Sequence, residues 1–563
     1  MGIATILLDQ GLITSEQLEM ALLEHRETGE RLEQVLIKRG MVRDDEVTRA
    51  IGEQLDLPVI DLTEISVSDE VLKSIPPQIV FRQKCVPIER RPASNGSPGA
   101  LRVATADPFD LSVFDELRLM VGCPIELVLA EEEELRNFIR THYGVGGDTL
   151  EAMSRGRGDD LLDDQFDAEA SEAEAAQEAS VIKLVNELLF EAIDSRATDV
   201  HIEPYENKLA VRYRVDGVLQ RANVPPTIHS FGSAIVSRIK IMASMNIAEK
   251  RKPQDGRITV RRKGGEFDLR VSVIPMLFGE GIVLRILNKS AVLMTLDDLG
   301  MPEHVVKTWD RLISRPHGIL LVTGPTGSGK STTLYASLNR IVSDEIKAIT
   351  VEDPVEYHVG GVNQIQVNHK VGLDFAAGLR SILRHDPDVI MIGEIRDKET
   401  AEAAVQASLT GHLVFSTLHT NDAAGALPRM LDMGVEPYLA ASSVEGVLAQ
   451  RLVRRVCDHC AEQYTPDASD LPEGVTLEPG EQLTRGTGCK NCFQTGYRGR
   501  VGVYELLQIN EPIREMVMNR ANAAKIVRQG MADGVLSRLQ DDGLVKARRG
   551  LTTVSEVMRV TTV

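Results

Sequence analysis

The sequence predicts an α/β protein of several domains, whose core is a largely parallel sheet around a phosphate-binding loop. Three observations support this fold class. The chain has 563 residues, which is too long for one hydrophobic core. Its C-terminal half alternates apolar strand-like runs with helical segments, an order that produces parallel sheets with crossover helices. Residues 324–332 match the glycine-rich phosphate-binding pattern at every fixed position.

The composition limits the class of protein and its location. The hydrophobic fraction of 43% and the aromatic fraction of 4% are typical of globular domains. No apolar run approaches the roughly 18–20 residues needed to span a bilayer. The first residues lack the basic region and cleavage site of a secretory signal, so we expect a cytoplasmic protein. The net charge of −20 argues against broad nucleic-acid binding, and no nucleic-acid partner is expected.

The first domain is expected at residues 1–148, with an internal repeat in its first part. Leu7–Ile13 pairs with Leu36–Val42 at an offset of 29 residues, and an amphipathic helix follows each copy. Thr14 and Gln17 have the spacing of a helix capping box. Mixed α/β structure follows the repeat. The expected strands are Val59–Leu62, Cys85–Ile88 and Leu101–Ala104.

An acidic flexible linker is predicted at residues 149–179. Residues 151–180 hold ten acidic side chains and two arginines, a composition that buries too little apolar surface to fold. One exposed helix over Ala168–Ala179 is the alternative. A second α/β domain is expected at 180–290, beginning with an amphipathic helix, Val181–Ile193. Its expected strands are Val200–Glu203, Leu209–Val215 and Phe267–Val273.

The third domain, residues 291–563, contains the phosphate-binding pattern. The apolar run Gly318–Thr323 predicts a buried strand before it, and Ser331–Val342 predicts a helix after it. Backbone N–H groups and the helix N-terminus in such a loop favour phosphate oxygens. These flanks argue against an accidental glycine-rich turn. We expect Lys330 to reach the β- and γ-phosphates of a nucleotide and Ser331 to hold Mg²⁺ through its hydroxyl. The predicted nucleotide-binding residues are Gly324, Pro325, Thr326, Gly327, Ser328, Gly329, Lys330, Ser331 and Thr332.

Carboxylates follow two further strands of this domain. After Ile346–Val351, the segment Glu352–Glu356 carries three carboxylates that could orient or deprotonate a water; a solvated loop is the alternative. After Asp388–Ile392, Glu394 stands in the Walker B arrangement that helps to hold Mg²⁺. Gly393 occupies the position where many such proteins carry a metal-binding aspartate.

Histidines and arginines are weaker candidates. His412 and His419 bracket an apolar strand, where a histidine is either structural or part of the nucleotide site. Arg257 and Arg270 in the second domain could reach a nucleotide across a domain or subunit boundary. Guanidinium groups stabilise the charge that builds up during phosphoryl transfer. Two more arginines, Arg380 and Arg384, are four residues apart on one predicted helix face.

Four cysteines predict a metal site. Cys457 and Cys460 form one C-x-x-C pair, and Cys489 and Cys492 form a second one 28 residues later. In a reducing compartment two such pairs indicate a tetrahedral structural Zn²⁺ site, with redox pairs or idle thiols as alternatives. A closed four-thiolate shell leaves no open position, so the metal is expected to be structural. The zinc-binding insertion is expected at residues 455–500.

Together these motifs resemble the bacterial secretion and pilus-extension ATPases, the GspE/PilB family. The resemblance covers residues 180–563, and the ordered set of motifs is specific. It implies a RecA-like ATPase core after a PAS-like domain. The motifs that carry it are Ala197–Pro204, Lys252–Arg257, the phosphate loop, Glu352–Glu356, Gly393-Glu394 and His412–His419.

The resemblance also implies roles for residues. Glu356 would activate water, Glu394 would organise the metal, and His419 would sense the γ-phosphate. Arg257 and Arg270 would close onto the nucleotide. Family members form hexameric rings on the cytoplasmic face of the inner membrane, where a GspL-like docking protein and a GspF-like platform protein would be the partners.

Three functions remain open at this stage. The passage Leu284–Leu293 resembles the type II secretion branch more than the pilus-extension branch, so a secretion motor is favoured. A nucleotide-gated adaptor with little hydrolysis is the third possibility. The N-terminal repeat resembles a domain that in some relatives binds cyclic di-GMP. Here Gly2-Ile3-Ala4 and Arg31-Leu32-Glu33 depart from its Arg-Leu-Gly pattern, so a docking module is favoured over dinucleotide binding.

Overall fold

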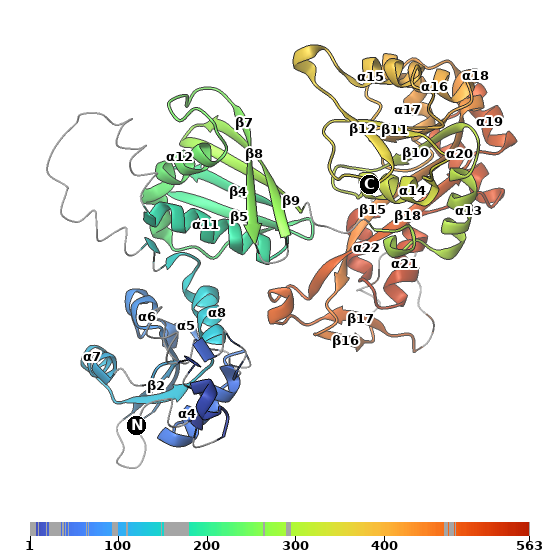
Figure 1. The fold of residues 1–563 in the computed structure, drawn as a ribbon. Helices are drawn as coiled ribbons and strands as arrows, with labels where there is room; N and C mark the ends of the chain where they lie inside the picture. Colours follow the sequence, from blue (N-terminus) through green and yellow to red (C-terminus); the bar gives the residue numbers. More distant parts are fainter. Residues whose placement is uncertain are drawn as a thin grey trace. The chain divides into compact units, whose positions relative to one another are not determined.

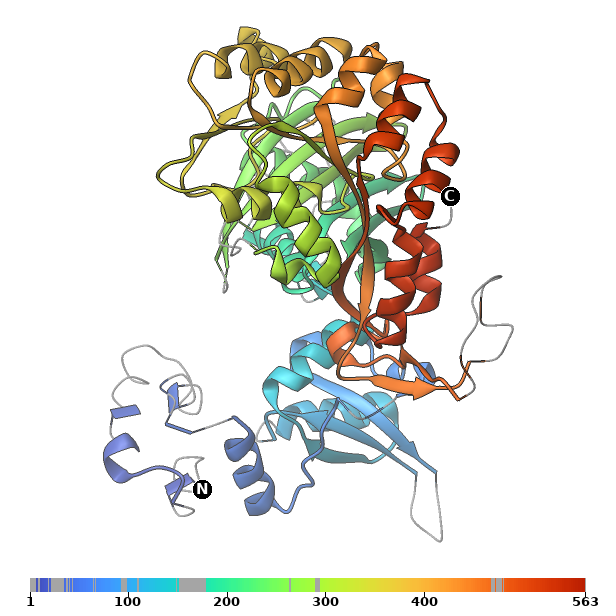
Figure 2. The ribbon, with the colours of Figure 1, turned by 90° about the vertical axis from the view of Figure 1, so that its right-hand side faces the viewer.

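The protein folds as two compact units, Met1–Leu287 and Asn288–Val563 (Figures 1 and 2). Residues 151–178 of the predicted acidic linker and the positions Gly2–Ala4 and Arg31–Glu33 lie outside the described residues. The structure, a computed structural model, describes residues 7–561 except 9–10, 19, 22–34, 37–38, 40, 43, 64, 66, 93–98, 109–110, 148, 151–178, 263–264, 289–293, 467–470, 472–477 and 479.

The first part of unit 1 combines helices with a small sheet of order β1-β2-β3. The predicted capping box is confirmed: the Thr14 N–H donates to Gln17 Oε1 at 2.8 Å, and the Gln17 N–H donates to Thr14 Oγ1 at 3.2 Å. The elements are α4 (Asp44–Leu55), α5 (Asp69–Leu72), α6 (Pro77–Gln83), β1 (Cys85–Arg91), β2 (Ala100–Thr105), α7 (Leu111–Val121), β3 (Ile125–Leu129) and α8 (Glu132–Tyr143).

The expected strand at Val59–Leu62 is wrong in extent. The structure has a single parallel bridge there, between Val59 and Leu129. Pro58 has no N–H to donate to a ladder. At the other end, the Asp61 carboxylate accepts the Thr63 N–H at 2.7 Å, which turns the chain away from the sheet.

The second part of unit 1 is a sheet of order β6-β5-β4-β9-β8-β7, packed against two helices. The helix α11 (Ala179–Asp194) buries Val181, Leu184, Val185 and Leu188, the i, i+3, i+4, i+7 stripe of an amphipathic helix. The other elements are β4 (Ala197–Tyr205), β5 (Lys208–Val215), β6 (Val218–Arg221), α12 (Gly232–Met242), β7 (Gln254–Arg262), β8 (Gly265–Met276) and β9 (Gly279–Asn288).

Unit 2 is built on one sheet with the described strand order β12-β11-β13-β14-β10-β15-β18-β19. Neighbouring strands from β12 to β15 pair in parallel, and the last two pairs are antiparallel. This confirms the predicted α/β fold with a largely parallel sheet. The strands are β10 (Gly318–Thr323), β11 (Ala348–Glu352), β12 (Val362–Gln366), β13 (Val389–Ile392), β14 (Leu413–Leu418), β15 (Val444–Val456), β18 (Tyr497–Gln508) and β19 (Leu536–Ser537).

Helices cover both faces of this sheet (Figure 1). Successive side chains of a strand point to opposite faces. Ile319 and Leu321 of β10 accordingly join one hydrophobic cluster, and Leu320 and Val322 join the other. The helices are α13 (Glu303–Ile313), α14 (Lys330–Ile341), α15 (Phe375–Ile382), α16 (Lys398–Leu409), α17 (Ala426–Asp432), α18 (Pro437–Ser443), α19 (Glu511–Met518), α20 (Ala523–Ala532), α21 (Leu539–Arg548) and α22 (Val554–Thr561).

None of the helices that the structure describes combines the length and hydropathy needed to cross a bilayer.

The long antiparallel pair β15–β18 extends beyond the rest of the sheet (Figure 2). The cysteine segment lies at its end, with the short strand pair β16 (Ala461–Tyr464) and β17 (Leu483–Gly486).

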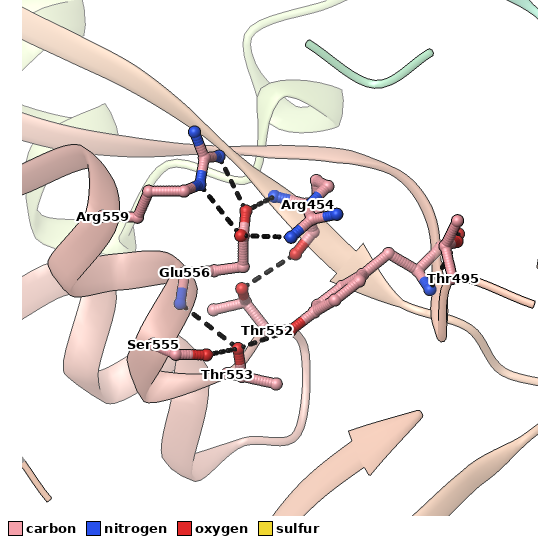
Figure 3. A network of polar contacts seen from close by, with 8 residues as sticks. Arg454, Thr495, Thr552, Thr553, Ser555, Glu556 and Arg559 are labelled. Atoms are coloured by element: carbon pink, nitrogen blue, oxygen red, sulfur yellow. Dashed lines mark hydrogen bonds and ion pairs between the residues drawn. The ribbon is translucent and has the colours of Figure 1, made fainter. Parts of the chain in front are cut away.

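The C-terminal helix α22 is fixed to the base of this extension by one buried carboxylate (Figure 3). Glu556 accepts a hydrogen bond from Arg454 Nη2 at 2.6 Å and another from Arg559 Nη2 at 2.8 Å. The Arg454 guanidinium lies 4.1 Å from the centre of the Tyr497 ring, and Thr552 Oγ1 donates to the Arg454 carbonyl at 2.8 Å. The network therefore joins β15, β18 and the C-terminal segment.

Replacing Glu556 with glutamine is expected to destabilise unit 2 in a pH-dependent manner. Burial would raise the pKa of Glu556, but hydrogen bonds from Arg454 and Arg559 outweigh it and lower the pKa from 4.5 to about 2. The stabilisation is therefore present above pH 4.5 and lost as the pH falls toward 2. We expect a loss of about 2 kcal/mol at neutral pH, allowing for solvent screening.

The fluorescence of Trp309, the single tryptophan of the chain, measures this effect because Trp309 is buried in unit 2. Urea unfolding of the full chain should separate Glu556→Gln from the parent at pH 7, and the difference should shrink as the pH falls from 4.5 toward 2. A difference that stays constant between these pH values would contradict the assignment. Glu511→Gln, at an exposed position of α19, is the matched control.

Candidate active site

The phosphate loop connects the buried strand β10 to α14, as the sequence predicts. Gly324 and Gly329 have φ values of +148° and +90°, in the region that favours glycine. A Cβ on Gly324 would lie 2.5 Å from the main-chain oxygen of Gln450. A Cβ on Gly329 would lie 2.8 Å from Gln450 Nε2. The close passage of β15 behind the loop therefore accounts for glycine at positions 324 and 329.

Lys330 is held against the backbone of the loop. Its Nζ donates to the carbonyl oxygens of Gly324 at 2.9 Å and Pro325 at 3.1 Å. Burial lowers the pKa of Lys330 from 10.5 to about 8; Glu394 and Glu356 oppose this effect, and Arg451 adds to it. An anionic ligand would favour the charged ammonium.

The loop has the features needed to hold a triphosphate. Ser328 Oγ is buried and has no hydrogen-bond partner among the described residues. Space is open beside Gly327, where a Cβ would have no neighbour within 4 Å in the described structure. Ser331 and Thr332 lie in the first turn of α14, where backbone N–H groups and the helix dipole favour anions.

The carboxylates after β11 differ in burial. Glu352 is buried and accepts hydrogen bonds from Thr350 Oγ1 at 2.5 Å, from Gln364 Nε2 at 3.0 Å and from the Tyr335 hydroxyl. These hydrogen bonds indicate a structural role for the Glu352 carboxylate. Glu356 is exposed, and its backbone N–H donates to the Tyr335 hydroxyl at 3.3 Å. The network around Glu352 therefore positions the segment that presents Glu356.

Glu394 and His419 lie next to each other at the ends of β13 and β14. His419 Nε2 is 3.3 Å from Glu394 Oε2, and Arg396 forms an ion pair with the same carboxylate. A Cβ on Gly393 would lie 3.2 Å from the Phe375 ring and 3.4 Å from the Cα of Glu352. The close approach of β13 to β11 thus accounts for glycine at this position.

His412 does not share the site with His419. It precedes β14 and lies beside Gly318, at the opposite end of the sheet from the phosphate loop. Its Nδ1 contacts the Ala407 carbonyl at 2.8 Å and Thr410 Oγ1 at 3.1 Å, at the C-terminus of α16. His412 is therefore a structural histidine and not part of the candidate nucleotide site.

The predicted arginines have local partners. Arg257 and Arg270 face each other across β7 and β8 in unit 1, and Arg257 pairs with Asp268 at 3.2 Å. Arg380 forms an ion pair with Glu399. Arg384 lies beyond the end of α15 and donates to the Arg380 carbonyl at 2.7 Å.

The four cysteines converge at the end of the β15–β18 extension, with all sulfur atoms within 4.8 Å of one another. The Cys457–Cys489 and Cys460–Cys492 sulfur distances are both 3.8 Å. A tetrahedron with Zn–S bonds of about 2.3 Å has sulfur–sulfur edges of roughly 3.8 Å. Cys492 Sγ also accepts the N–H groups of Cys489 and Gly496, which favours a thiolate. The donor set and its geometry fit Zn²⁺.

Comparison with known proteins identifies the family. The model of the type II/IV secretion system protein family matches residues 174–559, more than half of the chain. The chain belongs to this family. A model of the MshEN domain matches residues 55–149. The match over residues 174–559 confirms the predicted resemblance to the GspE/PilB family. The protein is an ATPase of the secretion and pilus-assembly class.

Two relatives that align with nearly the whole chain come from different branches and have the same identity to it. The type IV pilus assembly ATPase PilB of Myxococcus xanthus is 42% identical over 564 residues, covering 98% of this chain and 97% of that protein. The type II secretion system protein E of Xanthomonas campestris is 42% identical over 562 residues, covering 98% and 96%. The X-ray structure of the ATPase DotB of Yersinia pseudotuberculosis shares the fold, with a TM-score of 0.50, 22% identity and coverage of 68% and 93%.

Several side chains that the motifs do not contain complete the site. Gln450 is buried behind the phosphate loop and accepts the Thr333 hydroxyl at 2.6 Å. Tyr335 links Glu352 to the Glu356 backbone, and Arg396 pairs with Glu394. Arg451 lies beside Gly324. Tyr335 lies one turn after Ser331 on the predicted helix, so the motif itself could have drawn attention to it.

Proposed function

We propose that the protein is a hexameric motor that hydrolyses Mg·ATP to drive type II secretion from the cytoplasmic face of the inner membrane. The observation that carries this proposal is the grouping of Lys330, Glu356, Glu394 and His419. The ammonium of Lys330 is close enough to Glu394 and Glu356 for both to affect its pKa, and His419 contacts Glu394.

In this proposal, each group of residues has a separate role in ATP binding or hydrolysis. The phosphate loop, residues 324–332, binds the triphosphate through backbone N–H groups and Lys330. Ser331 and Glu394 hold Mg²⁺ or its waters, and the ion offsets phosphate charge when bound. Glu356 accepts a proton from the attacking water. His419 reports on the γ-phosphate through its contact with Glu394.

Arg257 and Arg270 are proposed to stabilise the transferring phosphoryl group from the domain that precedes the core. Their location on a different unit from the phosphate loop means that ring assembly or interdomain movement would bring them to the nucleotide. An isolated monomer is therefore expected to have low activity. Docking partners of the GspL and GspF kind would receive the movement.

Replacing Glu356 with glutamine is expected to lower kcat by about 10²-fold while leaving ATP binding intact. The amide keeps the size of the side chain but cannot accept the proton from water. Phosphate release and binding of a fluorescent ATP analogue would be measured on the same full-length preparation. Glu303→Gln, the same change at an exposed position of α13, serves as the control. Equal turnover of parent and Glu356→Gln would exclude this role.

Pilus extension is the second candidate, because the pilus assembly relative is as similar as the secretion relative. The two functions are separated in the source organism by deleting the gene. Loss of secreted proteins from the medium, with surface pili retained, supports secretion. The reverse result would assign the protein to pilus extension.

A further inference from the structure

An arginine outside the recognised motifs lies at the first glycine of the phosphate loop. In the register of β15 with β10, Ala449 faces Thr323, and Arg451 follows two residues later. The Arg451 side chain is only 8% exposed. A Cβ on Gly324 would lie 3.1 Å from Arg451 Nη1. The guanidinium therefore lies against the loop backbone at the point where β10 ends.

The same guanidinium binds the segment that follows His419. Arg451 Nη2 donates to the Asn421 carbonyl at 2.8 Å and lies 3.4 Å from Asn421 Oδ1. A second contact joins the same two segments: Thr323 Oγ1 lies 2.6 Å from Thr420 Oγ1. The start of the phosphate loop and the segment carrying His419 are thus joined at two adjacent positions.

A buried carboxylate holds this segment from another strand. Glu505 of β18 accepts the Ala423 N–H at 2.7 Å and the Leu539 N–H at 3.3 Å. Burial raises the pKa of Glu505. Burial lowers the pKa of Arg451, whereas Glu505 and Asp422 favour its charged form. The guanidinium is therefore held by its contacts with Asn421 and the loop, and the nearby carboxylates favour its charged form.

We propose that Arg451 is a positioning residue for ATP hydrolysis, which holds the His419 segment in register with the first glycine of the phosphate loop. It acts through hydrogen bonds to backbone oxygens rather than by contact with the reacting phosphoryl group. This inference rests on the proposed nucleotide site. Misplacement of a reacting group by about 1 Å can cost on the order of 10²-fold in rate.

A positioning role can be separated from a loss of folding by its kinetics. Arg451 contacts the loop backbone and the Asn421 carbonyl, so its loss should lower kcat per folded chain more than it changes KM for Mg·ATP.

The test compares Arg451→Gln and Arg451→Lys in the full-length, assembled chain with Mg·ATP. Arg451→Gln is expected to lower kcat per folded chain about tenfold or more, with a smaller change in KM. Arg451→Lys keeps the charge and a hydrogen-bond donor, so it should recover part of the lost kcat. Its kcat stays reduced, since one ammonium cannot reproduce the fork of donors. Arg311→Gln, an exposed arginine of α13, is expected to leave both quantities unchanged.

Two outcomes would overturn the proposal. One is parental kcat in Arg451→Gln. The other is activity reduced only in proportion to the unfolded fraction, measured by Trp309 fluorescence. Lys330→Ala distinguishes failure of this inference from failure of the nucleotide site: if that variant retains turnover, the site itself is wrong, whatever Arg451 does.

Discussion

ATP hydrolysis is expected to fall by about 10³-fold when Lys330 is replaced with alanine. The ammonium is fixed by the Gly324 and Pro325 carbonyls at the N-terminus of α14, where the triphosphate would lie. Without it, the loop retains backbone N–H groups but loses the cation that offsets charge on the γ-phosphate. Phosphate release by the assembled full-length chain at saturating Mg·ATP measures the loss.

The matched control is Lys307→Ala on α13, which removes an exposed lysine paired with Glu303. It should keep the parental rate. Turnover by Lys330→Ala at that rate would place the nucleotide elsewhere. A parent chain that binds ATP but releases no phosphate when assembled would instead favour the nucleotide-gated adaptor.

The parts of the fold that the sequence predicted well are those fixed by local pattern. The apolar run before Gly324 could form only a buried strand, and the structure divides its side chains between two cores. The spacing of Thr14 and Gln17 likewise determines a capping box within one turn. Both predictions depend on neighbouring residues, where periodicity and hydrogen-bond reach are decisive.

The sequence was less informative where distant strands meet. Nothing local distinguishes Glu352 from Glu356; only Tyr335 and Gln364, brought from other elements, make the first a structural acid. Arg451 follows the phosphate loop by more than a hundred residues, so its place beside Gly324 depends on the order of strands.

The direction of β14 distinguishes the two histidines that flank it, although the residue pattern alone does not. In a parallel sheet the ligand site lies at the carboxyl ends of the strands. His412 precedes β14 and His419 follows it. Strand direction therefore separates the two histidines, and it places only His419 on the side of the phosphate loop.

Replacing Cys457 with serine is expected to remove a zinc ion bound at about one per chain. Three thiolates cannot close the tetrahedral shell, and the segment between β15 and β18 should lose its fixed structure. Unfolding should stop at the base of the extension, where Glu556 bonds to Arg454 and Arg559 independently of the metal. Unit 2 should therefore keep its buried Trp309 signal.

Metal analysis and limited trypsin digestion test both parts of this expectation. Arg485 of β17 and Arg498 at the start of β18 are exposed cleavage sites near the cysteines. Each loss of about 1.4 kcal/mol in local stability raises the open population tenfold, so cleavage there should become at least about tenfold faster. Cys123→Ser, a thiol outside the cluster, should change neither zinc content nor cleavage. A parent protein without zinc would refute the metal site, and collapse of the Trp309 signal in Cys457→Ser would show that the extension is not anchored separately at its base.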